Sequence, residues 1–293
     1  MGFQLHDVER QLDKFVSHLE QQGLSHITTA AVVSWISYLH VSPVTKTGRF
    51  GMVRHFAKYI RATDPQHEVP PTGLFPSRRR RQKPYIYSND EITRLMHVAQ
   101  QIPWAAGSCA KTFTTLLGLL AVTGLRIGEC LALNDADVDL EEGILTVVVT
   151  KFRKSRLIPL HLSTQEQLRL YKRWRNRQFP KPRCPSFLVS SQGTRLWKGN
   201  VRNTFHGLSC RIGIRHPGDR HGPRLHDFRH TFAVNTLRAW YDAGTDVEQH
   251  LPELATYLGH THVSDTYWYL TGTPELLRVV AARIDHLDEE ATT

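Results

Sequence analysis

A proline-rich and strongly basic stretch divides the chain into two unequal parts. Residues 63–84 contain five prolines, and their second half carries the cations Arg78, Arg79, Arg80, Arg81 and Lys83. Proline interrupts regular structure and adjacent like charges repel, so the stretch is unsuited to the interior of a helix or a sheet. We therefore expect a helical domain over residues 1–66, a basic linker over 67–84 and a second domain over 85–293.

The chain as a whole is basic. It has 37 lysines and arginines against 27 aspartates and glutamates, which gives a formal net charge of +10, and its 17 histidines could add to this. Such an excess favours a polyanionic partner, because phosphates that are neutralised by cations release their counterions. Charge alone fits a merely basic protein equally well, and the linker cations fit either an exposed tether or a segment lying on duplex DNA.

The compartment follows from what the sequence does not contain. No apolar run approaches membrane-spanning length, and the N-terminus has no charged-then-apolar signal pattern. The four cysteines lie far apart and form no Cys-x-x-Cys pair, which argues against a disulfide frame or a zinc knuckle. We expect a cytoplasmic protein with no membrane partner and no metal site.

The first domain is predicted to be a small bundle of three or four amphipathic helices. Apolar residues recur at helical spacing in three sets, which are Val8, Leu12, Phe15, Val16 and Leu19, then Val32, Trp35, Ile36 and Leu39, then Met52, Phe56 and Ile60. On the third helix Arg54, Lys58 and Arg61 share a face away from the apolar stripe. That face is either solvated or in contact with phosphates, and we take its cations as candidate DNA contacts.

The second domain is predicted to be mainly helical with one small antiparallel sheet. Ser88 and Glu91 have the spacing of a capping box before an apolar run, and a further apolar helix ends at Gly124. The β-branched and aliphatic runs at 144–150 and 157–160 flank a polar segment and predict a hairpin.

Helices are expected to follow the hairpin to the end of the chain. Ser163 with Glu166 marks one start, and another helix is expected to have Pro252 in its first turn and to end at Gly259. The fold class is therefore mainly α (α+β), with a helical bundle preceding a mainly helical domain that holds a small sheet.

Side chains suited to phosphodiester chemistry are distributed over this second domain. Cleavage passes through a pentavalent phosphorus with charge on its non-bridging oxygens, so preorganised cations are needed, and the planar fork of arginine suits this role. Arg126 follows Gly124 at a junction of two helices, where a turn and a helix N-terminus can be directed at one anion. His226 and Arg229 are three residues apart and would share one helix face.

The order and spacing of these residues resemble the tyrosine recombinase (phage integrase) family over about residues 85–275. Thr-Gly-Leu-Arg-Ile-Gly-Glu around Arg126 is similar to the family's first arginine box, and Leu-His-Asp-Phe-Arg-His-Thr-Phe-Ala around Arg229 to its second. His260 lies in Tyr-Leu-Gly-His, and Tyr269 follows nine residues later, where the family places its nucleophile. The resemblance implies an integrase-like fold and an enzyme that forms a 3′-phosphotyrosine without ATP, a divalent metal or another cofactor.

The nucleophile needs a stabilised phenolate, because the ordinary pKa of tyrosine is about 10. The two arginines and the histidines His226 and His260 could supply this stabilisation and the base. Tyr267 competes for the role, but two helical steps turn it about 200° from Tyr269, so both cannot face one phosphate. We assign the nucleophile to Tyr269.

The leaving 5′ oxygen needs a proton as it departs. The stretch Thr-Lys-Phe-Arg-Lys-Ser-Arg-Leu-Ile-Pro-Leu resembles the family's hairpin Gly-Lys-Gly-x-Lys-x-Arg-x-x-Pro-Leu, which aligns Lys151 with the family's general acid. Thr150 and Phe152 replace both glycines, so Lys154 stays an alternative.

The resemblance also implies an assembly on DNA. Family members clamp double-stranded DNA between two domains and exchange strands as tetramers on two synapsed sites, so the chain would associate with the nucleoid when bound. Beyond Tyr269 an amphipathic helix is expected, which packs either on its own domain or on a neighbouring protomer, with apolar positions Leu276, Val280, Ile284 and Leu287.

Three other functions fit parts of the sequence. His226 and His230 are spaced like the zinc ligands of a metalloprotease, but Asp227 stands where that motif has its glutamate. A topoisomerase IB-like enzyme would use nearly the same site as a monomer, and a DNA-binding protein could have lost the activity. The target sequence and the biological task are not readable from the chain.

Overall fold

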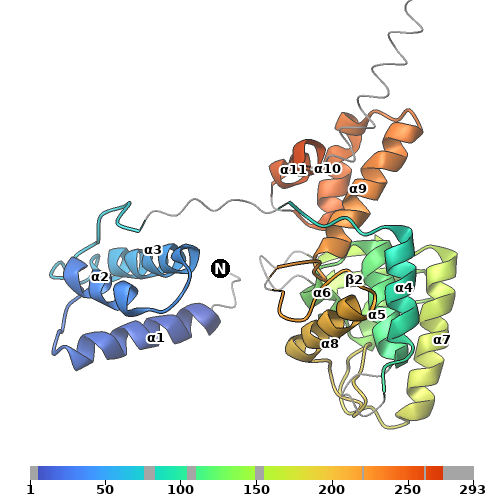
Figure 1. The fold of residues 1–293 in the computed structure, drawn as a ribbon, viewed down its shortest axis with the longest axis horizontal. Coiled ribbons are helices and arrows are strands. Elements are labelled where there is room, and N and C mark those ends of the chain that lie inside the picture. Colours follow the sequence, from blue (N-terminus) through green and yellow to red (C-terminus); the bar gives the residue numbers. More distant parts are fainter. Residues whose placement is uncertain are drawn as a thin grey trace, which may run out of the picture. The chain divides into compact units, whose positions relative to one another are not determined.

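A computed structural model describes residues 6–75, 83–103, 110–148, 155–219, 221–260 and 262–272. The chain divides into two compact units, Met1–Gln82 and Lys83–Thr293 (Figure 1). The expected C-terminal helix lies outside the described ranges. So do five of the candidate site residues, which are Arg78, Arg79, Arg80, Arg81 and Lys151. The alternative Lys154 lies outside them as well.

The first unit contains the expected helices α1 (His6–Gln21), α2 (Thr29–Tyr38) and α3 (Pro43–Ile60). The hydroxyl of Thr28 caps α2, and Ser42 caps α3 ahead of a proline in its first turn. The apolar faces of the three helices meet in one core, whose buried residues include Phe15, Val32, Trp35, Ile36 and Val53. Helical periodicity therefore located this bundle correctly.

Residues after position 66, where the sequence suggested that the linker begins, still contact the helical bundle. The backbone N–H of Glu68 donates to the carbonyl of Ile27 at 2.8 Å, and Nδ1 of His67 accepts from the N–H of Ile27 at 3.0 Å. Further along, the ring of Phe75 packs 5.4 Å from that of Phe50. Proline keeps this segment out of regular structure, yet hydrogen bonds and an aromatic contact hold it on the bundle.

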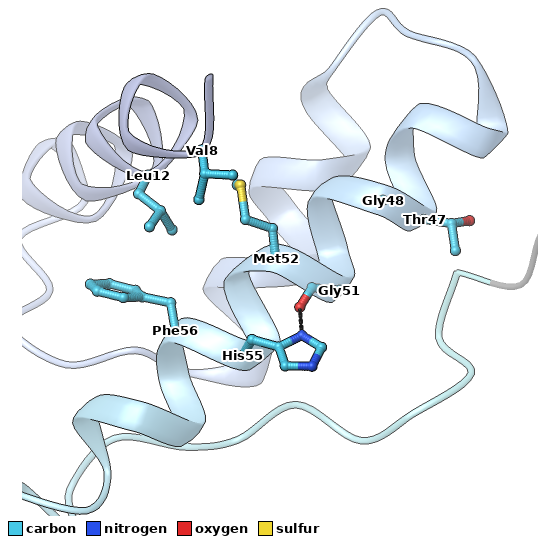
Figure 2. Close-up of a pocket in the computed structure, with 8 residues that line it drawn as sticks. All are labelled: Val8, Leu12, Thr47, Gly48, Gly51, Met52, His55 and Phe56. Atoms are coloured by element: carbon cyan, nitrogen blue, oxygen red, sulfur yellow. Dashed lines mark hydrogen bonds between the residues drawn. The ribbon is translucent and has the colours of Figure 1, made fainter. Parts of the chain in front are cut away.

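An open apolar groove lies on the bundle between α1 and α3. Val8 and Leu12 of α1 face Met52 and Phe56 of α3 across a volume of about 560 Å³ (Figure 2). Gly51 of α3 also lines the groove. Among the described residues no helix is long and apolar enough to cross a membrane.

The second unit is mainly helical with one three-stranded antiparallel sheet, as predicted. Its helices are α4 (Asn89–Ala99), α5 (Ala110–Thr123), α6 (Ile127–Ala132), α7 (Leu162–Gln178), α8 (Lys198–Arg211), α9 (Asp227–Asp242), α10 (Val247–Leu258) and α11 (Ser264–Gly272), with a short 3₁₀ helix η2 (Asp135–Asp137). Its strands are β1 (Val138–Asp139), β2 (Ile144–Val148) and β3 (Ser155–Pro159), in the order β1-β2-β3.

Helix α5 is the centre of this unit and explains where the site lies. It packs against α4, α7 and α9 (Figure 1), and Phe113, Leu116, Leu117 and Leu120 on it are fully buried. Burial of these side chains fixes the helix axis, since each stabilises the fold by about 2 kcal/mol relative to exposure. The C-terminal end of α5 therefore presents the next residues, beginning with Gly124, at a defined place.

The hairpin pairs β2 with β3 in a register that sets which side chains face the helices. Thr146 lies opposite Leu157, and Val147 lies opposite Arg156. Alternation along β3 buries Ile158 fully and turns Arg156 to the same side, toward the helices, while Leu157 is exposed. A charged side chain is thus directed into the unit from the sheet.

Two helix starts differ from those that the sequence suggested. Helix α7 begins two residues earlier than a Ser163 cap would place it, because the ring of His161 accepts from the N–H of Ser163 and serves as the cap. Helix α10 begins after Asp246, whose carboxylate accepts from the N–H groups of the first turn, so Pro252 lies inside the helix. In both cases the sequence suggested a start from one local residue, Ser163 or Pro252. The residue that caps the helix, His161 or Asp246, lies upstream of it.

Candidate active site

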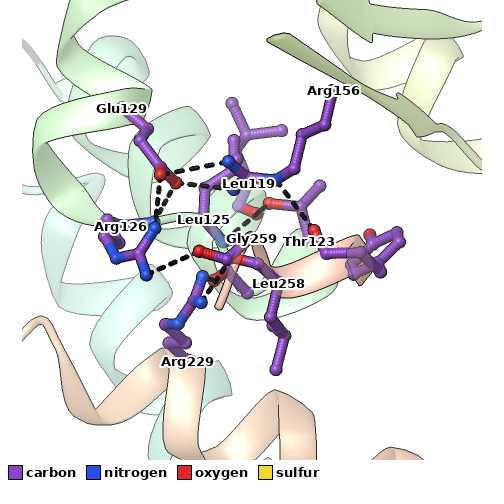
Figure 3. Close-up of polar contacts among 11 residues, drawn as sticks. Leu119, Thr123, Leu125, Arg126, Glu129, Arg156, Arg229, Leu258 and Gly259 are labelled. Atoms are coloured by element: carbon purple, nitrogen blue, oxygen red, sulfur yellow. Dashed lines mark hydrogen bonds and ion pairs between the residues drawn. The ribbon is translucent and has the colours of Figure 1, made fainter. Parts of the chain in front are cut away.

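Arg126 is held at the junction between α5 and α6. Gly124 ends α5 with a φ of +60°, a conformation that favours glycine, and Arg126 is the residue before the first turn of α6. Its guanidinium donates to Glu129 Oε1 at 2.8 Å and to the carbonyl of Gly259 at 3.1 Å (Figure 3). The side chain is 38% exposed, so an anion can still reach it.

Arg229 comes from the first turn of α9 and is 1% exposed. Its guanidinium donates to the carbonyl of Gly124 at 3.0 Å and to that of Leu258 at the end of α10 (Figure 3). Burial and the nearby charge of Arg126 lower the pKa of Arg229 to about 10, so it stays cationic at neutral pH. Both arginines thus donate to carbonyls at the C-terminal end of α10, and Arg229 also donates to the end of α5.

Glu129 and Arg156 form a buried pair behind Arg126. Arg156 Nη2 donates to Glu129 Oε2 at 2.7 Å, and its Nε donates to the carbonyl of Tyr257 at 2.8 Å. Burial alone would raise the pKa of Glu129, but the hydrogen bonds and charges of Arg156 and Arg126 outweigh it and lower that pKa to about 2. Glu129 is therefore a carboxylate at any pH at which the enzyme would act.

His226 lies at the start of α9 and is kept neutral. Although part of the residue is exposed to solvent, desolvation of the ring and the positive charges of Arg229, Arg224 and Arg126 lower the pKa of His226 to about 4. Its neighbour Asp227 is buried and accepts from the backbone N–H of Arg224 at 2.7 Å. Asp227 thus fixes the beginning of α9, which is a different role from that of a metalloprotease base.

Tyr269 on α11 is 2% exposed and points into the same region. The hydroxyl lies 3.1 Å from Nδ1 of His230, and the ring of His260 stacks on the tyrosine ring at 6.2 Å. The phenol also lies near enough to Arg229 to raise the pKa of that arginine against the effect of burial. Tyr267 is 45% exposed, so the two tyrosines face different ways, as the helical geometry predicted.

The structure brings together five of the six residues that the sequence marked for catalysis. These are Arg126, His226, Arg229, His260 and Tyr269, and the sixth, Lys151, lies outside the described ranges. Within the described ranges no group of three metal-ligating side chains occurs.

The cations predicted to contact DNA differ in their local contacts. In the first unit Arg54 donates from Nε to the carbonyl of Pro70 at 2.9 Å, whereas Lys58 and Arg61 are exposed. Lys83, at the start of the second unit, is also exposed. Arg54 therefore holds the chain after α3 with at least part of its guanidinium, while the exposed cations remain available to a phosphate.

Three residues of the site were not singled out for it by sequence: Glu129, Arg156 and His230. Glu129 lies in the quoted motif around Arg126, and Arg156 lies in the quoted hairpin motif. The alternation of β3 could have indicated that Arg156 points inward. His230 lies one helical turn after His226 and was considered only as a metal ligand. Its contact with Tyr269 spans 39 residues, and no local pattern indicates it.

Comparison with known proteins agrees with this arrangement. Residues 86–275 match the profile of the phage integrase family. A Sinorhizobium fredii protein designated integrase/recombinase y4rB is 44% identical over 297 residues, covering 100% of this chain and 95% of the relative. Tyrosine recombinase XerC of Pseudomonas putida is 24% identical over 269 residues, covering 89% of this chain and 82% of the relative.

A solved structure shows the same fold. The integrase of the transposon Tn1549, in complex with transposon right end DNA, superimposes with a TM-score of 0.67 at 16% identity, covering 96% of this chain and 94% of that one. The chain therefore belongs to the phage integrase family. It is a site-specific recombinase of the tyrosine type.

Proposed function

We propose that this recombinase cleaves and rejoins double-stranded DNA through a covalent 3′-phosphotyrosine on Tyr269, with neither metal nor nucleotide cofactor. The observation that carries the proposal is the position of the phenol, which lies beside His230 and close to the guanidinium of Arg229. A tyrosine beside preorganised cations has the two elements that phosphoryl transfer to a hydroxyl requires.

In the proposed reaction Arg126 and Arg229 hold the non-bridging oxygens of the scissile phosphate. Both are anchored to backbone carbonyls, so little reorganisation is needed as charge develops on those oxygens. His226, being neutral, contributes a hydrogen bond and no further positive charge. His260 lies against the tyrosine ring and keeps its orientation.

The bonds exchanged explain why no energy source is needed. The Tyr269 oxygen forms a bond to phosphorus while the bond from phosphorus to the 5′ oxygen breaks, and that oxygen leaves with a proton from Lys151 or Lys154. One phosphodiester replaces another, so the 5′ hydroxyl of a partner strand can reverse the step. The choice of lysine rests on the family resemblance of the hairpin.

DNA binding is proposed from charge and from the relatives together. The net charge is +10, and the exposed Lys58 and Arg61 in the first unit and Lys83 after the arginine run are placed to meet phosphates. The Tn1549 integrase was solved with transposon end DNA, which fits a role of this chain in a mobile element. We further propose a DNA-binding domain over 1–66, a linker over 67–84 whose first residues lie against that domain, and a catalytic domain over 85–293. The active assembly is proposed to be a tetramer on two synapsed sites.

A trapping experiment tests the proposed function. Genomic fragments carrying random nicks are incubated with the protein, because a nick next to the cleavage site releases a short strand and leaves the adduct unable to religate. Covalent complexes are isolated under denaturing conditions and their DNA ends are sequenced. We expect adducts with one 3′ end sequence from the wild type and from Tyr267→Phe, and none from Tyr269→Phe.

The outcomes separate the alternatives. Adducts that persist in Tyr269→Phe would refute the assigned nucleophile. Adducts at arbitrary sequences, together with relaxation of any supercoiled plasmid and no recombinant products, would indicate a topoisomerase IB-like enzyme. DNA binding with no adduct from any variant, the wild type included, would indicate a protein that has lost the activity.

A further inference from the structure

We propose that His230 is the general base that takes the proton from Tyr269 as its oxygen attacks phosphorus. The inference rests on the proposed function, because it adds a residue to the same reaction. His230 Nδ1 lies 3.1 Å from the hydroxyl oxygen of Tyr269, and the two ring centroids are 5.5 Å apart. This is the separation over which a base accepts a proton directly.

The tautomer of His230 follows from the role. A neutral imidazole accepts through one nitrogen and donates through the other. For Nδ1 to receive the phenol proton, the ring must carry its own proton on Nε2. The phenol then donates and His230 accepts, which leaves a lone pair of the tyrosine oxygen free to attack phosphorus.

His226 is less suited to this role, although the family resemblance includes it among the catalytic residues. Its pKa of about 4 leaves a weak base, since partial desolvation and three arginines oppose the imidazolium form. Its ring meets that of His230 edge to face, with centroids 4.8 Å apart and planes at 83°. His226 thus packs beside His230, while His230 makes the contact with the tyrosine oxygen.

His260 is also placed differently. Its ring stacks on that of Tyr269 with an angle of 21° between the planes, so it presents its face to the phenol and not a nitrogen lone pair. Its Nδ1 lies 2.7 Å from the hydroxyl of Thr266. Stacking on one side and a hydrogen bond on the other make His260 a support for the tyrosine.

The proton balance of the step is complete. As the bond from Tyr269 to phosphorus forms, the hydroxyl proton passes to Nδ1 of His230, which becomes an imidazolium. The bond from phosphorus to the 5′ oxygen breaks, and the oxygen receives a proton from the hairpin lysine. In the rejoining step His230 returns its proton to the departing tyrosine oxygen, so the same residue acts as general acid.

Two substitutions of His230 separate a base from a mere hydrogen-bond partner. His230→Asn keeps an acceptor close to the position of Nδ1 but is not basic, whereas His230→Ala removes both properties. We expect both variants to bind the target sequence identified by trapping as the wild type does. They should cleave it about 100- to 10,000-fold more slowly. His250→Asn, a histidine on α10 that contacts Glu253, is the matched control and should cleave at the wild-type rate. Wild-type cleavage by His230→Asn would overturn the proposal.

A second measurement is independent of how much of each variant folds. A target strand with sulfur in place of the bridging 5′ oxygen has a leaving group that needs no proton. The ratio of cleavage rates on the sulfur and oxygen strands does not depend on the folded fraction. We expect this ratio to rise strongly in Lys151→Ala or Lys154→Ala, whichever removes the general acid, and to stay at the wild-type value in His230→Asn.

The failure of this inference can be told apart from failure of the proposed function. A ratio that rises in His230→Asn as it does in the lysine variant would mean that His230 serves the leaving group and not the nucleophile. Both results presuppose that Tyr269→Phe forms no adduct. If that variant does form one, the nucleophile itself is misassigned and the reaction proposed above is wrong.

Discussion

Arg156 on β3 donates two hydrogen bonds to the carboxylate of Glu129 on α6, at 3.1 and 2.7 Å (Figure 3). The same carboxylate accepts from the backbone N–H and from the side chain of Arg126. Arg156 also donates to the carbonyl of Tyr257 near the end of α10. One side chain from the hairpin therefore connects the sheet, the partner of Arg126 and the helix that precedes His260.

Replacing Arg156 with glutamine should lower both stability and cleavage. Glu129 is 11% exposed and would lose its fork-shaped partner, and breaking a buried ion pair typically costs about 3–5 kcal/mol. Because Arg126 would then be the main partner left to Glu129, we expect its guanidinium to shift away from the phosphate. Cleavage per folded molecule should fall, as measured by urea unfolding and single-turnover assays on the same preparations.

The control for this prediction is Arg175→Gln. Arg175 is also buried, pairs with Asp135 at 2.8 Å and donates to a backbone carbonyl, but none of its described partners belongs to the active site. It should lose stability without any loss of cleavage per folded molecule. If Arg156→Gln behaved in the same way, the Arg156–Glu129 pair would be structural only.

Arg126 and Arg229 should differ in what their removal does to the fold. Arg229→Ala leaves the carbonyls of Gly124 and Leu258 without their donor in a buried place, whereas Arg126 is partly exposed. We expect both alanine variants to slow cleavage about 100- to 1,000-fold with much smaller losses in DNA affinity. Only Arg229→Ala should also lower the melting temperature substantially. Equal losses of cleavage and binding would identify both as simple backbone anchors for DNA.

The neutral state of His226 predicts how stability changes with pH. The ordinary pKa of 6.5 applies to the unfolded chain, and the folded value is about 4, so below pH 6.5 the unfolded state binds the extra proton. This histidine therefore leaves stability unchanged above about pH 6.5 and lowers it as the pH falls toward 4, by an amount that solvent screening reduces because the residue is partly exposed. His226→Gln should flatten the stability profile in this window. An NMR titration that showed His226 protonating at its ordinary value would contradict the prediction.

Local signals in the sequence predicted much of the fold. Ser88 and Glu91 make both hydrogen bonds of the expected capping box, and Gly124 and Gly259 adopt the left-handed conformation expected at helix ends. Each of these features depends on residues within one turn of each other. The same holds for the hairpin, in which the β-branched and aliphatic runs on either side of a short polar segment pair as β2 and β3. Periodicity and caps therefore placed most of the elements, apart from the starts of α7 and α10.

The contacts that complete the site could not be predicted in this way. Glu129 and Arg156 are 27 residues apart, and His230 and Tyr269 are 39 apart, so both contacts exist only once α5 has ordered the helices around it. Motifs indicated which arginines and which tyrosine to consider, but not which neighbours hold them. Pro252 shows the opposite error, since a local rule favoured a helix start there and the cap at Asp246 overrode it.

At Gly259 the geometry of the site should be sensitive to a single methyl group. Its φ is +66°, and a Cβ added there would lie 2.9 Å from Nη1 of Arg156. Gly259→Ala should therefore cost about 1–3 kcal/mol of stability and also displace Arg156 from Glu129. Because the carbonyl of Gly259 accepts from Arg126, cleavage per folded molecule should fall as well.

The matched variant for this last prediction is Gly128→Ala on α6. A Cβ at Gly128 meets nothing within 4 Å, and its backbone is helical, so alanine should stabilise the protein by about 0.5–1 kcal/mol with no loss of cleavage. The comparison uses unfolding curves and single-turnover rates for both variants. If Gly259→Ala lost stability but cleaved as fast as Gly128→Ala, the carbonyl of Gly259 and the placement of Arg156 would have no part in holding Arg126 for catalysis.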